Sequence, residues 1–201
     1  MKLSNKQLFT GKAKGFTLVE LLVVIAILAT LGALSYGPIV RQMQSAQVLK
    51  STKVCTDLIA AVDSFQLEYQ HLPFTGTYPS VDTAYITDEA GFGFIRVLTG
   101  DDTTVNTKGI SYFDADQADG ELDGLVLNTA GDPTKLLDKW GNPYHILLDF
   151  NTSGDISLTT LLLPSPTPES GYAAIRRTST GVALSPGKDA MFDGIDDSTS
   201  F

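Results

Sequence analysis

Acidic side chains gather near the C-terminal end of the chain, in the segment SPGKDAMFDGIDD over residues 185–197. Four carboxylates fall within nine residues there: Asp189, Asp193, Asp196 and Asp197. Like charges this close repel unless they are solvated or bridged by a cation, and Ca²⁺ accepts about six to eight oxygen ligands in irregular geometry. The pattern indicates a structural calcium site formed by these aspartates, with Ser185 as a further ligand through its hydroxyl or carbonyl oxygen. A solvated acidic tail is the alternative.

Two other acidic segments match metal-binding templates less well. DFNTSGDI, which begins at Asp149, has suitable residues for the first half of an EF-hand loop, but Thr160 stands where that loop needs a glutamate. A hairpin turn through Ser153 and Gly154 is the preferred interpretation. DADQADGELDG, residues 114–124, has one residue too many for the same template. We expect it to form an exposed turn.

The residues needed for catalysis are missing from the sequence. It has no G-x-S-x-G elbow, no Walker glycine loop and no H-E-x-x-H motif. The single cysteine, Cys55, excludes a disulfide within the chain, and only two histidines, His71 and His145, are present. The formal charge of −9 disfavours contact with nucleic acid phosphates. We therefore expect a protein that is not an enzyme and binds no nucleic acid.

A further carboxylate, Glu20, lies inside an apolar segment near the N-terminus. Residues 1–15 are basic and polar, whereas residues 21–40 carry no charge and are long enough to cross a membrane as a helix. The basic flank predicts a cytoplasmic N-terminus and an exported body. A secretory signal cleaved near Ser35, or a plain signal anchor, would explain the apolar run. Neither explains Glu20, because a charge in hydrocarbon is costly and is usually kept for a partner.

The segment KGFTLVELLVVIAIL, residues 14–28, resembles the N-terminus of type IV pilin-like proteins, which include pilins and the pseudopilins of type II secretion. The matching features are Gly15, Phe16, Glu20 and the apolar run that follows. The resemblance implies that a membrane-embedded prepilin peptidase cuts between Gly15 and Phe16 and methylates the new amino group of Phe16. It also implies a filament in which Glu20 neutralises the Phe16 amine of a neighbouring subunit, since either charge would be costly if buried unpaired.

These residues need a long helix to position them. We expect a transmembrane and assembly helix over residues 16–40, continuing past a kink near Pro38 into an amphipathic helix over residues 41–71. The second part carries an apolar stripe at helical spacing, in which Cys55 is a small core residue. The members of the stripe are Cys55, Leu58, Ile59, Val62, Phe65 and Tyr69.

The remaining residues, 72–201, are expected to form an exported body that covers this stripe. Residues 72–110 have the pattern of a variable connecting segment, and Trp140 is expected to cap the helix–sheet core. Strands are predicted at 125–128, 144–150, 156–163, 172–177 and 181–184. The predicted fold class is α+β: after a leader at residues 1–15, a long N-terminal helix packs on a small antiparallel sheet, as in pilins.

Two segments of the body resemble the major, G-type pseudopilin of type II secretion. DKWGNPYHILLD, residues 138–149, is similar to its Asp-Pro-Trp-Gly-Asn-Pro-Tyr stretch, with Lys139 in place of proline. Residues 185–197 are similar to its calcium-binding ending, with Ala190 in place of a glycine. The resemblance implies a single-pass inner-membrane protein that assembles into a periplasmic pseudopilus and supports protein secretion. Its partners would be copies of itself, minor pseudopilins and an inner-membrane secretion platform.

Two alternatives stay open. A true type IV pilin or minor pilin would serve adhesion, motility or DNA uptake, but many pilins close their C-terminal region with a disulfide that this chain cannot form. An exported binding protein that uses a prepilin-type anchor would stay unassembled, so its function would not depend on Glu20.

Overall fold

The computed structural model describes residues 15–156, 175–176, 180–190, 192 and 198–199. The described elements make an α+β protein, in which a long N-terminal helix is followed by short strands and a short second helix. The long helix, α1, covers Leu18–Tyr69. The chain divides into two compact units, Met1–Met43 and Gln44–Phe201, and α1 contributes residues to both.

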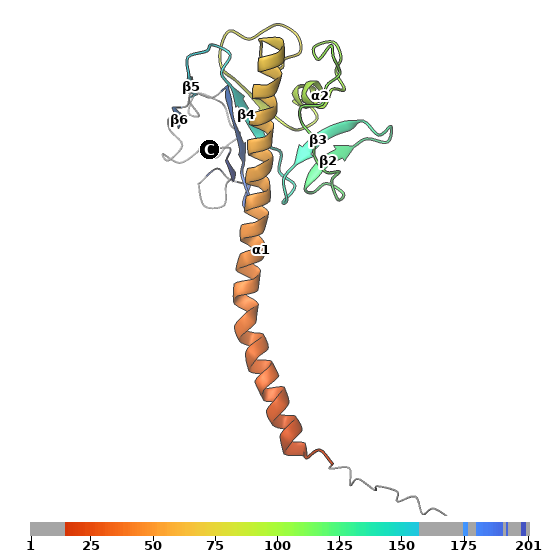
Figure 1. Ribbon diagram of the computed structural model, residues 1–201, viewed down its shortest axis with the longest axis vertical. Helices are drawn as coiled ribbons and strands as arrows, with labels where there is room; N and C mark the ends of the chain where they lie inside the picture. The colour runs from red at the N-terminus through yellow and green to blue at the C-terminus, as the bar shows by residue number, and fades with distance from the viewer. Residues whose placement is uncertain (1–14, 157–174, 177–179, 191, 193–197, 200–201) are drawn as a thin grey trace, which may run out of the picture. The chain divides into compact units, whose positions relative to one another are not determined.

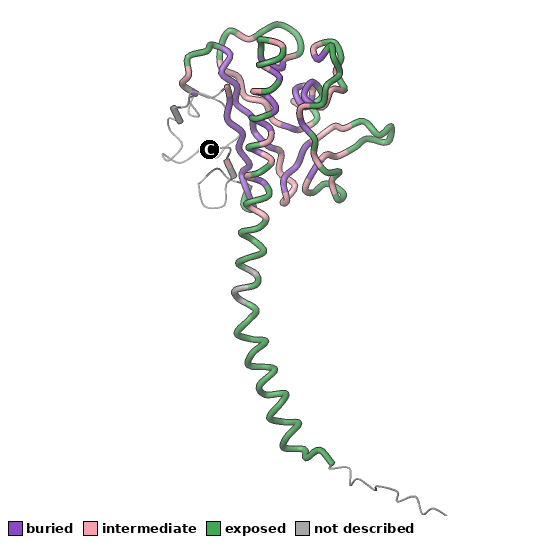
Figure 2. Tube along the Cα trace, in the orientation of Figure 1, coloured by how far each residue is buried: buried purple, intermediate pink, exposed green. Residues whose placement is uncertain are grey.

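In the first unit, α1 is apolar and exposed around its circumference (Figure 2). Among the described residues, α1 is the helix that is long and apolar enough to cross a membrane. A helix with apolar side chains on every face needs lipid or other helices around it, so this unit is compatible with membrane anchoring. The helix runs on through residues 37–38, which confirms the predicted continuation beyond Pro38.

In the second unit, the rest of α1 lies against a four-stranded antiparallel sheet with the strand order β1-β4-β7-β8 (Figure 1). These strands cover Thr83–Ile86, His145–Leu148, Gly181–Ser185 and Ser198–Thr199. The predicted stripe on α1 packs on the sheet, and its core members join residues of β4 and β7 in one buried cluster. That cluster includes Cys55, Leu58, Ile59, Val62 and Phe65 of α1 with Ile146, Leu148 and Ala183 of the sheet.

Three smaller pieces complete the described part of this unit. The second helix, α2, covers Gly93–Thr99, and the two-stranded sheets pair β2 (Gly124–Leu127) with β3 (Pro133–Leu137) and β5 (Asp155–Ile156) with β6 (Ile175–Arg176). The α2 helix ends at Gly100, whose φ of 85° lies in the left-handed region that favours glycine.

Residues 72–110 are more ordered than the connecting segment that the sequence predicts, because they contain β1 and α2. The four residues of β1 are all half-buried, so they lack the alternation that marks a strand in sequence. The α2 helix spans only seven residues, too few for a clear helical period. Its side chains Phe94, Ile95, Val97 and Leu98 nevertheless belong to the main core.

The predicted hairpin through Ser153 and Gly154 is wrong. The strand β4 pairs with β1 and β7, whereas β5 pairs with β6. The Asp149 carboxylate accepts hydrogen bonds from the backbone N–H groups of Ser153, at 3.1 Å, and Gly154, at 2.8 Å. The Asp149 side chain therefore provides acceptors for backbone N–H groups that a hairpin would pair with the opposite strand.

Two leucines on the second half of α1 allow a matched test of this packing. Leu58 is fully buried and Leu67 is 78% exposed. We expect Leu58→Ala to lower the free energy of unfolding of the body, residues 41–201, by about 2–5 kcal/mol, because it leaves a cavity in the core. Leu67→Ala should change it by no more than about 0.5 kcal/mol. Urea denaturation measures both values, and equal effects would contradict the assigned helix face.

Candidate functional site

The residues of the predicted cleavage segment lie at the start of α1. Gly15, Phe16 and Thr17 have no regular secondary structure, and Phe16 is 74% exposed. Thr17 precedes the first helical residue, Leu18, and therefore occupies the N-cap position. Glu20 follows three residues after the cap, in the first turn of the helix.

Thr17 and Glu20 form a reciprocal capping box. The backbone N–H of Thr17 donates to Glu20 Oε2 at 2.9 Å, and the Thr17 hydroxyl donates to the same oxygen at 2.8 Å. The backbone N–H of Glu20 in turn donates to Thr17 Oγ1 at 3.2 Å. These bonds provide partners for two N–H groups that the helix itself leaves without acceptors. The Glu20 carboxylate thus has partners inside its own chain.

Thr17 is the residue of this site that the sequence reading did not single out. The sequence contains the pattern that indicates this role, because Thr-x-x-Glu before an apolar run is typical of a capping box. We interpreted Glu20 only as a charge kept for a neighbouring subunit. The structure adds a local role, in which Glu20 helps to define where α1 begins.

A second candidate site involves the turn at residues 138–142, which connects β3 to the segment before β4. Asp138 is fully buried, and its Oδ1 accepts hydrogen bonds from the backbone N–H groups of Trp140, at 2.9 Å, and Asn142, at 2.8 Å. Burial raises the pKa of Asp138, although these hydrogen bonds oppose the rise. Trp140 is half-buried and lies outside the core clusters, so its predicted capping role is wrong, whereas Tyr144 is 2% exposed and belongs to the main core.

This turn anchors the beginning of the acidic C-terminal segment. The Ser185 hydroxyl donates to Asp138 Oδ2 at 2.7 Å, and Asn142 Nδ2 donates to the carbonyl oxygen of Gly187 at 2.7 Å. Ser185 and Gly187 are buried. The DKWGN segment, residues 138–142, and the acidic segment are therefore joined physically across 45 residues or more.

The candidate calcium ligands are only partly described. Ser185 lies at the end of β7 with its hydroxyl directed to Asp138, and Asp189 is exposed in the following turn. Asp193, Asp196 and Asp197 lie outside the described residues. Within the described ranges, no group of three His, Cys, Asp or Glu side chains is close enough to hold a metal.

His145 and Phe192 form a second attachment of the acidic segment to the sheet. His145 begins β4, is 3% exposed, and meets the Phe192 ring edge-on with 4.9 Å between ring centroids. Phe192 lies between Asp189 and Asp193 in sequence and packs in a second core cluster with Leu147. Burial lowers the pKa of His145 to about 4, against the opposing charge of Asp88.

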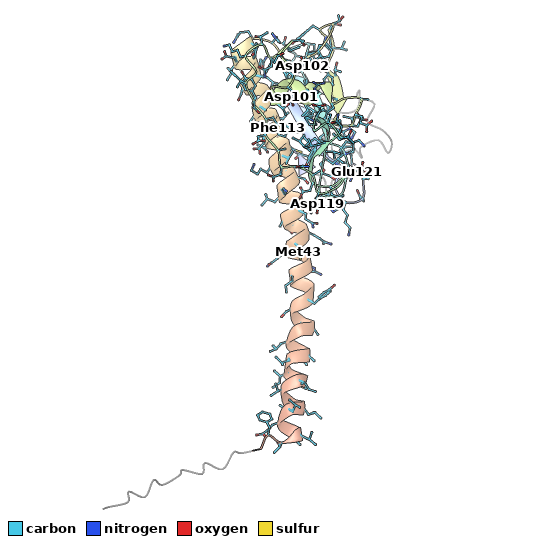
Figure 3. The ribbon with its side chains drawn as sticks, turned by 90° about the vertical axis from the view of Figure 1, so that its right-hand side faces the viewer. Met43, Asp101, Asp102, Phe113, Asp119 and Glu121 are labelled. Atoms are coloured by element: carbon cyan, nitrogen blue, oxygen red, sulfur yellow. The ribbon has the colours of Figure 1, made fainter. Side chains whose placement is uncertain are left out.

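The other acidic segment, residues 114–124, is an exposed turn, as predicted, except at its end. Figure 3 shows Asp119 and Glu121 at the surface of the second unit. Asp123 is instead half-buried and pairs with Lys50, at 2.8 Å, and Lys139, at 3.2 Å. Partial burial opposes ionisation, but the two ammonium groups outweigh it and hold the pKa of Asp123 below its usual range. This pairing is structural.

Comparison with protein-family models matches residues 10–36 to the prokaryotic N-terminal methylation motif. No curated protein and no solved structure matches the chain. The matched residues include the cleavage segment, the capping box and the apolar start of α1. The match supports an N-terminal signal of the prepilin type, which is the signal found in type IV pilin-like proteins.

Removing the Asp138 carboxylate should detach the acidic segment. Asp138→Ala leaves two half-buried backbone N–H groups and the buried Ser185 hydroxyl without this acceptor, so we expect a loss of about 3 kcal/mol in the free energy of unfolding. Asp138→Asn keeps one carbonyl oxygen for the backbone donors and should lose less. Hydrogen exchange at Gly187 should accelerate in the alanine variant. Unchanged exchange would contradict the anchoring role.

Burial of neutral His145 predicts a pH-dependent stability. The unfolded chain binds a proton at His145 near pH 6.5, whereas the folded chain binds it only near pH 4. Stability is therefore fully present above about pH 6.5 and falls as pH decreases towards 4, by roughly 3 kcal/mol in total. His145→Phe keeps a ring and removes the titration. Urea denaturation measures the free energy of unfolding of both proteins against pH. The wild type should lose stability relative to His145→Phe between pH 6.5 and pH 4, and parallel curves would disprove the predicted titration of His145.

Proposed function

We propose that this chain is a structural subunit of a periplasmic pseudopilus that supports protein export by a type II secretion system. The observation that carries the proposal is the methylation motif at residues 10–36, which includes the apolar start of the α1 helix. The precursor is a single-pass inner-membrane protein with a cytoplasmic N-terminus. Prepilin peptidase removes residues 1–15 and methylates Phe16.

Assembly in this proposal depends on an exchange of partners at Glu20. The exposed apolar side chains of α1, including Leu21, Ile25 and Leu28, leave lipid and pack on helices of neighbouring copies. Cleavage creates an ammonium group on Phe16, one residue before the capping box. In the filament, the Glu20 carboxylate pairs with the Phe16 ammonium group of a neighbouring subunit, because most other axial registers bury both charges without a partner. Minor pseudopilins and the inner-membrane secretion platform are the other proposed partners.

The C-terminal segment favours a pseudopilus over a true pilus. Cys55 is the single cysteine of the sequence, so no disulfide closes this segment within the chain. The Asp138 turn and Phe192 provide two attachments instead. We further propose that a structural Ca²⁺ ion completes the closure, bound by Asp189, Asp193, Asp196 and Asp197 with Ser185. This donor set contains only oxygen atoms, which suits a hard cation such as Ca²⁺.

Substitutions at Glu20 separate assembly from processing. Glu20→Ala should still be cleaved after Gly15, but filament yield should fall by roughly ten-fold or more, because the Phe16 ammonium group loses its counter-charge. Glu20→Gln keeps the side-chain shape and should fail in the same way. Gly15→Ala is the processing control and should accumulate as the uncut precursor. Normal secretion by both Glu20 variants would favour an unassembled, anchored binding protein.

Calcium should stabilise the body if the acidic segment binds it. At a Ca²⁺ concentration about 100 times the dissociation constant, binding to the folded state alone adds about 2.7 kcal/mol. The melting temperature of residues 41–201 should rise with Ca²⁺ and return with a chelator. A double variant, Asp193→Asn with Asp196→Asn, should lose the response, whereas Asp114→Asn should keep it. A melting temperature that Ca²⁺ and chelator leave unchanged would eliminate the metal site.

A further inference from the structure

The peptide bond between Gly15 and Phe16 lies outside α1 and is separated from it by Phe16 and Thr17. Neither residue is helical, and the first helical residue is Leu18. Nothing lies within 4 Å of the position that a Cβ atom would take on Gly15, and Phe16 is 74% exposed. Within the part of the chain that the structure describes, this peptide bond is therefore accessible to another protein.

Thr17 caps the start of α1. Its hydroxyl accepts the Glu20 N–H and its own N–H is held by Glu20 Oε2, so both groups are used in a non-helical N-cap. Without these bonds, the nearest residue able to act as an N-cap is Gly15, because glycine is tolerated there and phenylalanine is not favoured. A helix that starts after Gly15 would include Phe16 in its first turn and would fix the geometry of the Gly15–Phe16 bond.

We infer that Thr17 is a positioning residue for prepilin cleavage: its cap makes α1 begin two residues after the scissile bond and keeps that bond outside the helix for the peptidase. The inference rests on the proposed processing at Gly15. The methylation motif, which supports that processing, points to an enzyme that acts on this segment. Thr17 itself takes no part in the chemical step.

The capping box divides this role between two residues. Thr17 Oγ1 accepts the N–H of residue 20 whatever side chain residue 20 carries, so Glu20→Ala keeps one of the cap contacts. Substitution of Thr17 by valine or alanine removes the acceptor of the Glu20 N–H, which belongs to the first turn of the helix, and leaves only the bond from the backbone N–H of residue 17 to Glu20 Oε2. Cleavage should therefore depend more on Thr17, whereas filament assembly should depend more on Glu20.

A series of residues at position 17 tests this inference in the full-length precursor. The precursor is reconstituted in lipid vesicles with purified prepilin peptidase, and kcat/KM is measured by mass spectrometry of the released leader. Thr17→Ser and Thr17→Asn keep capping ability and should cleave within about two-fold of the wild type. Thr17→Val has almost the shape of threonine but cannot cap, and Thr17→Ala also cannot. Both should cleave roughly five-fold more slowly.

A structural measurement on the same variants separates helix position from direct recognition by the peptidase. The ¹³Cα chemical shift of labelled Phe16 in micelles should be non-helical for wild type, Thr17→Ser and Thr17→Asn, and should move towards helical values for Thr17→Val. Three results would each overturn the inference. The first is cleavage of Thr17→Val at the wild-type rate, and the second is cleavage of Thr17→Ser and Thr17→Asn as slow as that of Thr17→Val. The third is an unchanged Phe16 chemical shift in Thr17→Val. A wild-type precursor left uncut at Gly15 would instead overturn the proposed processing.

Discussion

A carboxylate in an otherwise apolar segment must keep a partner at each stage of the protein's existence. Glu20 lies in the first turn of a helix whose neighbouring side chains are apolar and exposed, and Thr17 supplies its hydrogen-bond donors within the chain. An uncompensated charge in hydrocarbon is costly, so these contacts matter most when the segment is in the membrane. In the proposed filament, the Phe16 ammonium group of a neighbouring subunit takes over part of this role. The position of the helix start, the proposed cleavage site and the proposed register of assembly then depend on the same short segment, through Gly15, Phe16, Thr17 and Glu20.

The second unit, Gln44–Phe201, holds an acidic segment against a small sheet without a disulfide. Buried Asp138 connects the turn before β4 to Ser185, and Asn142 connects the same turn to Gly187. Phe192 then packs against His145 of β4. The result is that two attachments flank Asp189 along the chain. Repulsion among the remaining carboxylates has to be relieved by solvent or by a cation, and the calcium proposal follows from that requirement.

The sequence predicted the elements whose patterns are long and locally complete. The helix α1 follows from an uncharged run and an apolar stripe, and Leu58, Val62 and Phe65 of that stripe are buried in the core. Strands β2, β4 and β7 were placed within a few residues because turn residues bound them. Elements that depend on distant partners were missed: β1 is defined by its pairing with β4, and α2 by the burial of four side chains in its seven residues. The Asp138–Ser185 hydrogen bond joins positions 47 residues apart, so no local pattern contains it.

The central claim is that this chain is a prepilin-type precursor, and the intact mass of the protein extracted from membranes tests it most directly. The account predicts a chain that begins at Phe16 and carries one additional methyl group. This single value reports the position of the cut, the action of the peptidase and the modification of the new N-terminus. A mass that corresponds to the uncut chain, or to cleavage near Ser35, would contradict the account. The protein would then be an ordinary anchored or secreted protein.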